Sequence, residues 1–136
     1  MKLLKKLAFV LAASLMLTSC GGGGSTPSSV AKKFAEATKN LDFKEAKKYV
    51  AKEYAEDVDE IIEQLNSPEA QAYMGMIKEM AKSAKIEVFG EKISDDGNSA
   101  TVTIKTEVMG QTHEEDLPLI KEDGVWKVDE KPSMGK

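Results

Sequence analysis

The sequence of 136 residues has no arginine, one cysteine and one histidine, and only 6% of its residues are aromatic. All 19 basic residues are therefore lysines, so the planar fork with which arginine binds phosphate is absent. With 23 acidic residues the net charge is −4, whereas a nucleic-acid-binding protein needs a basic face. The single cysteine excludes an intrachain disulfide and a multi-cysteine zinc site.

One apolar run is present, from residue 7 to residue 19, between a lysine-rich start and Cys20. This pattern indicates a secretory signal peptide, and the run is short for a transmembrane span. The segment Leu17-Thr18-Ser19-Cys20 resembles the lipobox of bacterial lipoprotein precursors. In those precursors the cysteine thiol receives a diacylglycerol group, and cleavage makes the cysteine the first residue. An ordinary signal peptide with a chance cysteine is the alternative.

Four glycines and the stretch STPSS follow Cys20, and they are typical of a flexible tether. We therefore expect four regions: a signal peptide (1–19), the lipidated Cys20 with its tether (20–29), a folded domain (30–130) and a tail (131–136). Without residues 1–19 the chain keeps 16 lysines against 23 acidic residues, a net charge of −7. A domain with this negative charge should be repelled by the surface of an anionic membrane. The predicted location is the bacterial cell envelope, outside the cytoplasm.

Apolar residues at helical spacing predict four helices after residue 28. The first buries Val30, Phe34, Ala37 and Leu41. Asp42 and Glu45 form a capping-box pattern for the second, which is expected to bury Phe43, Ala46, Tyr49, Val50 and Tyr54. The third carries Val58, Ile61, Ile62 and Leu65. After a Ser67-Pro68 start, the fourth is expected to bury Tyr73, Met74 or Met76, Ile77, Met80 and Ala84.

After Lys85 the apolar period becomes two, which predicts a four-strand antiparallel meander. Gly90 is the expected bulge in the first strand. Two-residue loops at Met109-Gly110 and Asp123-Gly124 fix the register. They place Val102 opposite Leu117, Ala100 opposite Leu119, Lys121 opposite Trp126 and Leu119 opposite Val128. Both loops then give one apolar face, and Pro118 loses little pairing because it lies beside Asp129 at the end of the last strand.

The predicted fold is α+β, with N-terminal helices packed on a curved four-stranded antiparallel sheet. Side chains expected in its core are Phe34, Tyr49, Val102, Leu117 and Trp126.

Two stretches carry a resemblance to a known family: SSVAKKFAEATKNLDFKEAKKYVAKEY (residues 28–54) and LIKEDGVWKVD (residues 119–129). They resemble the lumazine-binding-like domains of unknown function of bacterial lipoproteins, in the nuclear-transport-factor-2-like, cystatin-like superfamily. The resemblance implies a cone-shaped fold whose open end can hold a pocket. Enzymes of that superfamily place Asp, Tyr or His in the cone, whereas the lipoprotein branch has no assigned chemistry.

His113 faces Thr106 in the predicted register and lies two positions from Glu115. A histidine beside a carboxylate could act as an acid–base pair in a pocket. We favour the solvated end of a long hairpin, because no nucleophile or oxyanion group is near. One histidine with scattered carboxylates is also weak ligation, so no metal and no cofactor are expected.

Two other clusters have a functional and a structural interpretation. Met74, Met76 and Met80 could line an adaptable binding groove, but we favour core filling. The acidic residues Glu56, Asp57, Asp59 and Glu60 could hold a cation, but calcium-loop spacing is absent. A solvated helix start is the favoured interpretation there.

Together these observations predict a membrane-tethered lipoprotein with a non-catalytic binding or interaction domain. Its expected partners are the membrane, through the diacylglycerol group, and a hydrophobic small molecule or an envelope protein. The alternative is a small-molecule carrier or a small enzyme that uses an inward Glu115 or His113. An open pocket with an inward carboxylate would favour the enzyme, and a filled cone would favour the interaction domain.

Overall fold

The computed structural model describes residues 26–132, which fold as helices first and a sheet afterwards. The helical half consists of α2 (Pro27–Lys39), α3 (Phe43–Ala46), the 3-10 helices η2 (Lys47–Tyr49) and η3 (Lys52–Tyr54), α4 (Ala55–Leu65) and α5 (Pro68–Lys82). The strands are β1 (Lys85–Ile93), β2 (Ser99–Val108), β3 (Gln111–Glu122) and β4 (Val125–Val128). The predicted signal peptide and Cys20 lie outside the described residues. No helix within residues 26–132 combines the length and the apolar character needed to cross a membrane.

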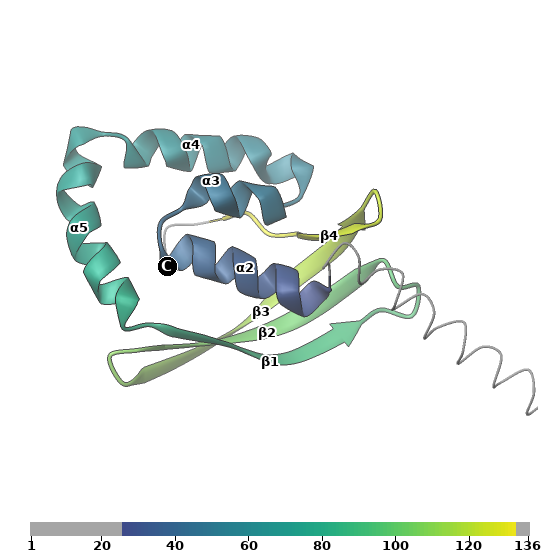
Figure 1. Cartoon of the computed structure of the whole chain (residues 1–136). Helices are drawn as coiled ribbons and strands as arrows, with labels where there is room; N and C mark the ends of the chain where they lie inside the picture. The colour runs from purple at the N-terminus through teal and green to yellow at the C-terminus, as the bar shows by residue number, and fades with distance from the viewer. Residues whose placement is uncertain (1–25, 133–136) are drawn as a thin grey trace, which may run out of the picture.

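The helices cover one face of the sheet in layers (Figure 1). α2 lies directly on the sheet, and α3 and α4 lie on the far side of α2. α5 stands at one end of the domain and connects α4 to β1. This arrangement is an α+β fold with an open four-stranded antiparallel sheet, as the sequence predicted.

The predicted strand register is confirmed. Val102 pairs with Leu117 and Ala100 with Leu119 across β2 and β3. Lys121 pairs with Trp126, and Leu119 with Val128, across β3 and β4. The register shifts between Val88 and Gly90 in β1, where a bulge was expected. The main-chain N–H of Asp129 donates to the Pro118 carbonyl (2.8 Å), so this proline does lie beside Asp129.

The hairpin loops explain why the register could be predicted. Met109, Gly110, Asp123 and Gly124 all have positive φ angles, between 51° and 79°. Two consecutive left-handed residues form the type I′ turn, whose twist matches that of the two strands that it joins. Glycine supplies that conformation without strain at the second position of each loop.

The first helix begins earlier than the sequence suggested. Thr26 is its N-cap and accepts a hydrogen bond from the Ser29 main chain (3.1 Å), and Pro27 is its first residue. The expected tether, which was placed up to residue 29, is therefore wrong at its C-terminal end. The Ser28 main-chain N–H and hydroxyl both donate to Glu91 Oε1 (2.9 and 2.7 Å), which links this helix start to β1. A carboxylate is favourable there because the N-terminus of a helix carries partial positive charge.

The second predicted helix is only partly correct. Asp42 does cap it, because its Oδ1 accepts from the Glu45 main chain (3.1 Å). The reciprocal half of the capping box is wrong, since the Asp42 N–H donates to the Ala37 carbonyl (2.8 Å). The helix ends at Ala46 and continues as a 3-10 turn, and Val50 then forms a parallel bridge with Val128.

The core lies between α2 and the sheet and extends under α3 and α4. Of the five side chains expected there, Phe34, Val102, Leu117 and Trp126 are buried. Tyr49 is only half-buried, because its hydroxyl reaches the surface and donates to Glu45 Oε1 (2.8 Å). The expected tail is not entirely outside the domain either. Lys131 pairs with Asp57 (2.7 Å), and Pro132 is buried.

Candidate functional site

The fourth helix exposes the apolar side chains that were expected in the core. No residue of α5 is buried. The exposed fractions are 65% for Tyr73, 66% for Met76, 42% for Ile77 and 48% for Met80. We call these four side chains the α5 surface. The prediction that they fill the core is wrong; of the residues expected to be buried in this segment, only Ala84 is buried and Met74 is half-buried.

The position of α5 explains this exposure. It begins at the Ser67 N-cap, whose Oγ accepts from the Ala70 main chain (3.3 Å), with Pro68 at its first position. The side chains on its half-buried stripe are Ala70, Met74 and Ala81, at helical spacing. Two of these three are alanines, so the contact with the body is narrow. The apolar side chains of α5 occupy a wider sector of the helix than the stripe that contacts the body.

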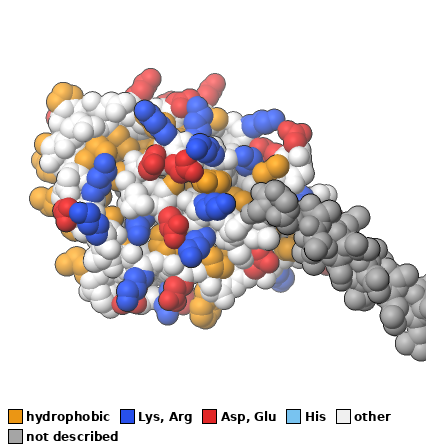
Figure 2. Space-filling model, viewed as in Figure 1, with side chains coloured by type: hydrophobic (Ala, Val, Ile, Leu, Met, Phe, Trp, Pro, Cys, Tyr) orange, Lys and Arg blue, Asp and Glu red, His pale blue; other side chains and the backbone are white. Residues whose placement is uncertain are grey.

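An exposed apolar cluster of this kind is a feature of interaction surfaces. Apolar side chains gather along the left edge of the space-filling view, over α5 (Figure 2). Two of the four residues are methionines, whose flexible side chains adapt to different partners. Tyr73 adds an aromatic ring with a polar tip, a residue type enriched in protein interfaces.

A groove separates α5 from the nearest loop of the body. Its volume is about 410 Å³, and we call it the α2–α5 groove. Residues from the α2–α3 junction, from α4 and from α5 line it: Asn40, Leu41, Asp42, Phe43, Lys44, Ile62, Leu65, Asn66, Met74 and Lys78. None of its lining residues comes from the sheet, so the groove is distinct from the interior of the cone.

A second depression, of about 340 Å³, lies beside β4. It has four lysines in its wall, and each of them is engaged. Lys47 pairs with Asp59 (2.7 Å) and Lys48 with Glu45 (2.7 Å). The ammonium groups of Lys52 and Lys127 bind Asp123 (3.1 Å) and the Lys48 carbonyl (2.6 Å). Three of these lysines are therefore paired with acidic side chains, and Lys127 is held by a main-chain carbonyl.

The helix-covered face of the sheet is filled by apolar side chains. Ala100, Val102 and Ile104 are buried on β2, and Leu117 and Leu119 are buried on β3. Within residues 26–132 no polar or charged residue is buried, and no buried side-chain nitrogen or oxygen lacks a hydrogen bond. No carboxylate is therefore buried in the described part of the cone.

The candidate acid–base residues lie on the part of the β2–β3 hairpin that extends beyond the core. Thr106 pairs with His113 as predicted, and Glu115 pairs with Ile104. His113 and Glu115 are exposed, and Thr106 is half-buried. Neither depression includes any of these three residues in its wall.

Of the four acidic residues at the start of α4, two form ion pairs and two are exposed to solvent. Asp57 binds Lys131 (2.7 Å), and Asp59 binds Lys47 (2.7 Å). Glu56 and Glu60 are exposed. Across the described residues, no group of three or more His, Cys, Asp or Glu side chains is placed to hold a metal ion.

Comparison with known protein families identifies the family of this chain. Residues 18–129 match the domain of unknown function DUF4878. The chain belongs to the DUF4878 family. No curated protein matches it at a significant level.

The DUF4878 domain also has a structural neighbour of known coordinates. A crystal structure from Campylobacter jejuni, named provisionally as an NTF2-like transpeptidase, is similar to it with a TM-score of 0.50. The two chains are 18% identical, and the similarity covers 79% of this chain and 100% of the other. At that identity the similarity concerns the fold alone. The DUF4878 domain therefore has an NTF2-like fold.

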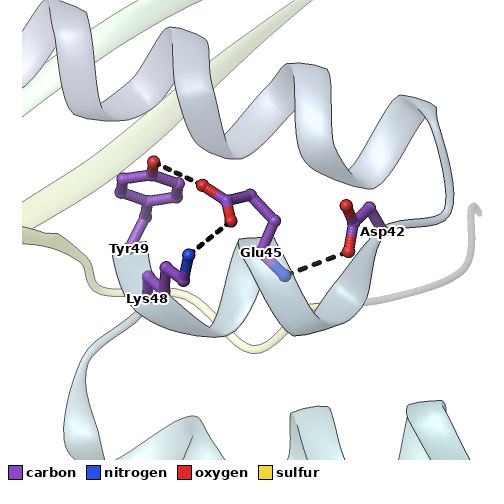
Figure 3. A network of polar contacts seen from close by, with 4 residues as sticks. All are labelled: Asp42, Glu45, Lys48 and Tyr49. Carbon is purple, nitrogen blue, oxygen red and sulfur yellow. Dashed lines mark hydrogen bonds and ion pairs between the residues drawn. The ribbon is translucent and has the colours of Figure 1, made fainter.

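A polar network near the start of α3 involves four residues of the DUF4878 domain (Figure 3). Glu45 accepts from Lys48 Nζ (2.7 Å) and from the Tyr49 hydroxyl (2.8 Å). The hydrogen bond from Lys48, followed by that from Tyr49, holds the pKa of Glu45 below its usual value. The same carboxylate raises the pKa of Tyr49 and of Lys48, because it stabilises the protonated form of each.

This network predicts an acid-sensitive contribution to stability. Because the pKa of Glu45 is lowered by folding, its carboxylate stabilises the fold above the unfolded pKa, about 4.3, and less as pH falls through the folded value. Glu45→Gln should therefore lower the urea midpoint at pH 7 and lower it much less at a pH below the folded pKa of Glu45. Glu87→Gln, on the outer face of β1, is the control. A midpoint difference for Glu45→Gln that is the same at both pH values would contradict this assignment.

Sequence reasoning missed the α2–α5 groove in the DUF4878 domain, although one local feature marks it. Leu41 has a φ of 58°, in the left-handed region. It follows the Asn40 C-cap of α2 in a Schellman-type ending, in which the N–H groups of Leu41 and Asp42 donate to the Thr38 and Ala37 carbonyls. Glycine is the usual residue at that position, and leucine there is an outlier.

Proposed function

We propose that this protein is a lipid-anchored, non-catalytic interaction domain of the bacterial cell envelope, which binds a partner protein through the α5 surface. The observation that carries the proposal is the exposure of Tyr73, Met76, Ile77 and Met80 on a helix with no buried residue. The lipobox-like segment at Cys20 supports the anchor, and the family match, which covers residues 18–129, includes Cys20. The apolar filling of the sheet face weighs against catalysis in the cone.

The geometry of the anchor argues for a protein, not the bilayer, as the occupant of the α5 surface. An extended chain spans at most about 3.6 Å per residue, so the link from Cys20 to Thr26 reaches no more than about 22 Å. The start of α2 would therefore stay close to the membrane. α5 lies beyond the opposite end of α2 (Figure 1), away from that attachment point.

The negative charge of the domain indicates what kind of partner fits the α5 surface. Residues 26–132 contain 15 lysines and 23 acidic residues, which gives the domain a net charge of −8. Glu69 lies one helical turn before Tyr73 and forms no ion pair with another described residue. Glu79, three residues after Met76, binds Lys82 (2.6 Å). We therefore assign to the partner an amphipathic helix with an apolar stripe and basic flanks, which complements the apolar surface and the acidic body.

A model peptide tests this assignment. A short helical peptide built from leucine and lysine should bind the full-length protein, and a matched peptide of leucine and glutamate should bind more weakly. Met76→Lys/Met80→Lys should weaken binding of the first peptide by at least about tenfold, because interface anchors contribute more than about 1 kcal/mol each. Isothermal titration calorimetry at low salt measures both affinities.

The matched control is Phe89→Lys/Met109→Lys, which places the same charges on two exposed apolar residues outside α5. Surface changes of this kind should alter stability by less than about 0.5 kcal/mol in either variant. Equal loss of peptide affinity in the two variants would rule out the α5 surface as the site. So would the absence of peptide binding to the wild type.

A further inference from the structure

Half of the residues that line the α2–α5 groove are apolar, and they come from three separate segments of the chain. Phe43 and Leu65 are buried there and give it a fixed base. Leu41, Ile62 and Met74 are half-buried, so each presents apolar surface to the groove. With a volume of about 410 Å³, the groove lies within the range of small-molecule sites.

Leu41 adopts a backbone conformation that a glycine would adopt more easily. Its φ of 58° closes the end of α2, where a side chain of any kind is disfavoured relative to glycine. The strain has one local result: an apolar side chain is placed in the wall of the groove. The ending of α2 therefore contributes an apolar side chain to the groove as well as closing the helix.

Two lysines stand in the wall of this groove without acidic partners. Lys44 and Lys78 form no ion pair or hydrogen bond with other described residues. The one carboxylate in the wall, that of Asp42, accepts from the Glu45 main chain (3.1 Å) as the cap of α3. The depression beside β4 differs, because its lysines are all engaged. The α2–α5 groove thus combines five apolar side chains with two lysines that have no acidic partner among the described residues.

We infer that the α2–α5 groove binds a single-chain amphiphile with an anionic head, of the fatty-acid class. The acyl chain lies along Leu41, Ile62 and Met74, and the carboxylate is held by Lys44 and Lys78. This site does not depend on the α5 surface. Met74 and Lys78 lie on the groove side of α5, whereas Met76 and Met80 lie on another side of the helix.

Decanoate, used below its micelle-forming concentration, is a suitable probe for the full-length protein. It should bind, whereas decyltrimethylammonium, with the same chain and the opposite charge, should bind at least about threefold more weakly at low salt. Lys44→Gln/Lys78→Gln should weaken decanoate binding by about three- to tenfold at low salt and by less at high salt. Lys92→Gln/Lys105→Gln removes two lysines outside the groove and should leave the affinity unchanged.

Leu41→Gly tests the apolar part without endangering the fold, since glycine suits the left-handed position. This variant should stay folded and lose most of its decanoate affinity, and perturbation of the Met74 methyl resonance should report the contact. Equal binding of the two amphiphiles would overturn the inference, and so would unchanged affinity in both Leu41→Gly and Lys44→Gln/Lys78→Gln. Binding of the leucine–glutamate peptide in the groove without any binding of decanoate would also overturn it, in favour of an acidic protein segment.

Discussion

Trp126→Ala should lower the free energy of unfolding by about 3–5 kcal/mol, the usual cost of truncating a large aromatic side chain in a core. Trp126 is only 5% exposed and lies on β4, which packs against α2. The Lys121 ammonium group lies 5.1 Å from the centre of its ring, so the truncation also removes a cation–π contact. A domain of this size has about 5–15 kcal/mol in total, so this one change removes a large part of its stability.

Thermal unfolding measures this effect. At about 4–8 °C per kcal/mol for a domain of about 100 residues, the melting temperature should fall by at least about 12 °C. Val125→Ala, next to it on β4 but facing the opposite side of the sheet, should lower the melting temperature by far less. A Trp126→Ala protein that melts together with Val125→Ala would contradict the inward position of Trp126.

Cys20→Ser should abolish attachment to the membrane. The thiol is the proposed site of the diacylglycerol group, and no second cysteine can replace it. Stable anchoring needs two or more acyl chains, so a protein without the lipid should leave the membrane fraction completely. Metabolic labelling with a fatty-acid analogue and detergent-phase partition measure the two consequences separately.

Ser19→Ala is the matched control for Cys20→Ser, because it keeps a small residue before the cysteine and should retain label and partition. A Cys20→Ser protein that still partitions into the detergent phase like the wild type would refute the lipoprotein proposal. That result would leave the NTF2-like fold and the α5 surface unaffected, because both rest on residues 26–132.

The sheet could be predicted from the sequence because its restraints are local. Two-residue loops ending in Gly110 and Gly124 demand left-handed backbone, and each fixes a register without any knowledge of the rest of the fold. The alternation of Val102 and Ile104 with polar residues then identifies the buried face. Because both loops place the apolar residues on the same face, each loop confirms the strand register that the other predicts.

The start of α2 shows how composition misled the prediction of the tether. Glycine and serine around residue 25 are typical of a linker. Thr26, Pro27 and Ser29 nevertheless form an N-cap, a first-position proline and a reciprocal hydrogen bond from the Thr26 N–H to Ser29 Oγ (3.1 Å). Proline at the first helical position is a recognised start signal, so the true boundary could have been found from these residues.

The α5 surface could not be predicted, because periodicity identifies an apolar face but not what covers it. The spacing of Tyr73, Met76, Ile77 and Met80 is the same whether the cover is this domain or a partner. The connection from α4 to β1 holds α5 at the end of the domain, where only its alanine-rich stripe meets the body. The α2–α5 groove could not be predicted for a related reason, since residues from three separate segments line it.

The central claim is that a partner covers the α5 surface when the protein is in its membrane. Cysteine accessibility tests it directly, by comparison of Met76→Cys and Met109→Cys in the full-length lipoprotein. Met76 and Met109 are 66% and 78% exposed, so both thiols should react rapidly with a small maleimide in the purified protein. In whole cells the account predicts strong protection at position 76 and none at position 109. Equal reactivity of the two positions in cells, as in the purified protein, would contradict it.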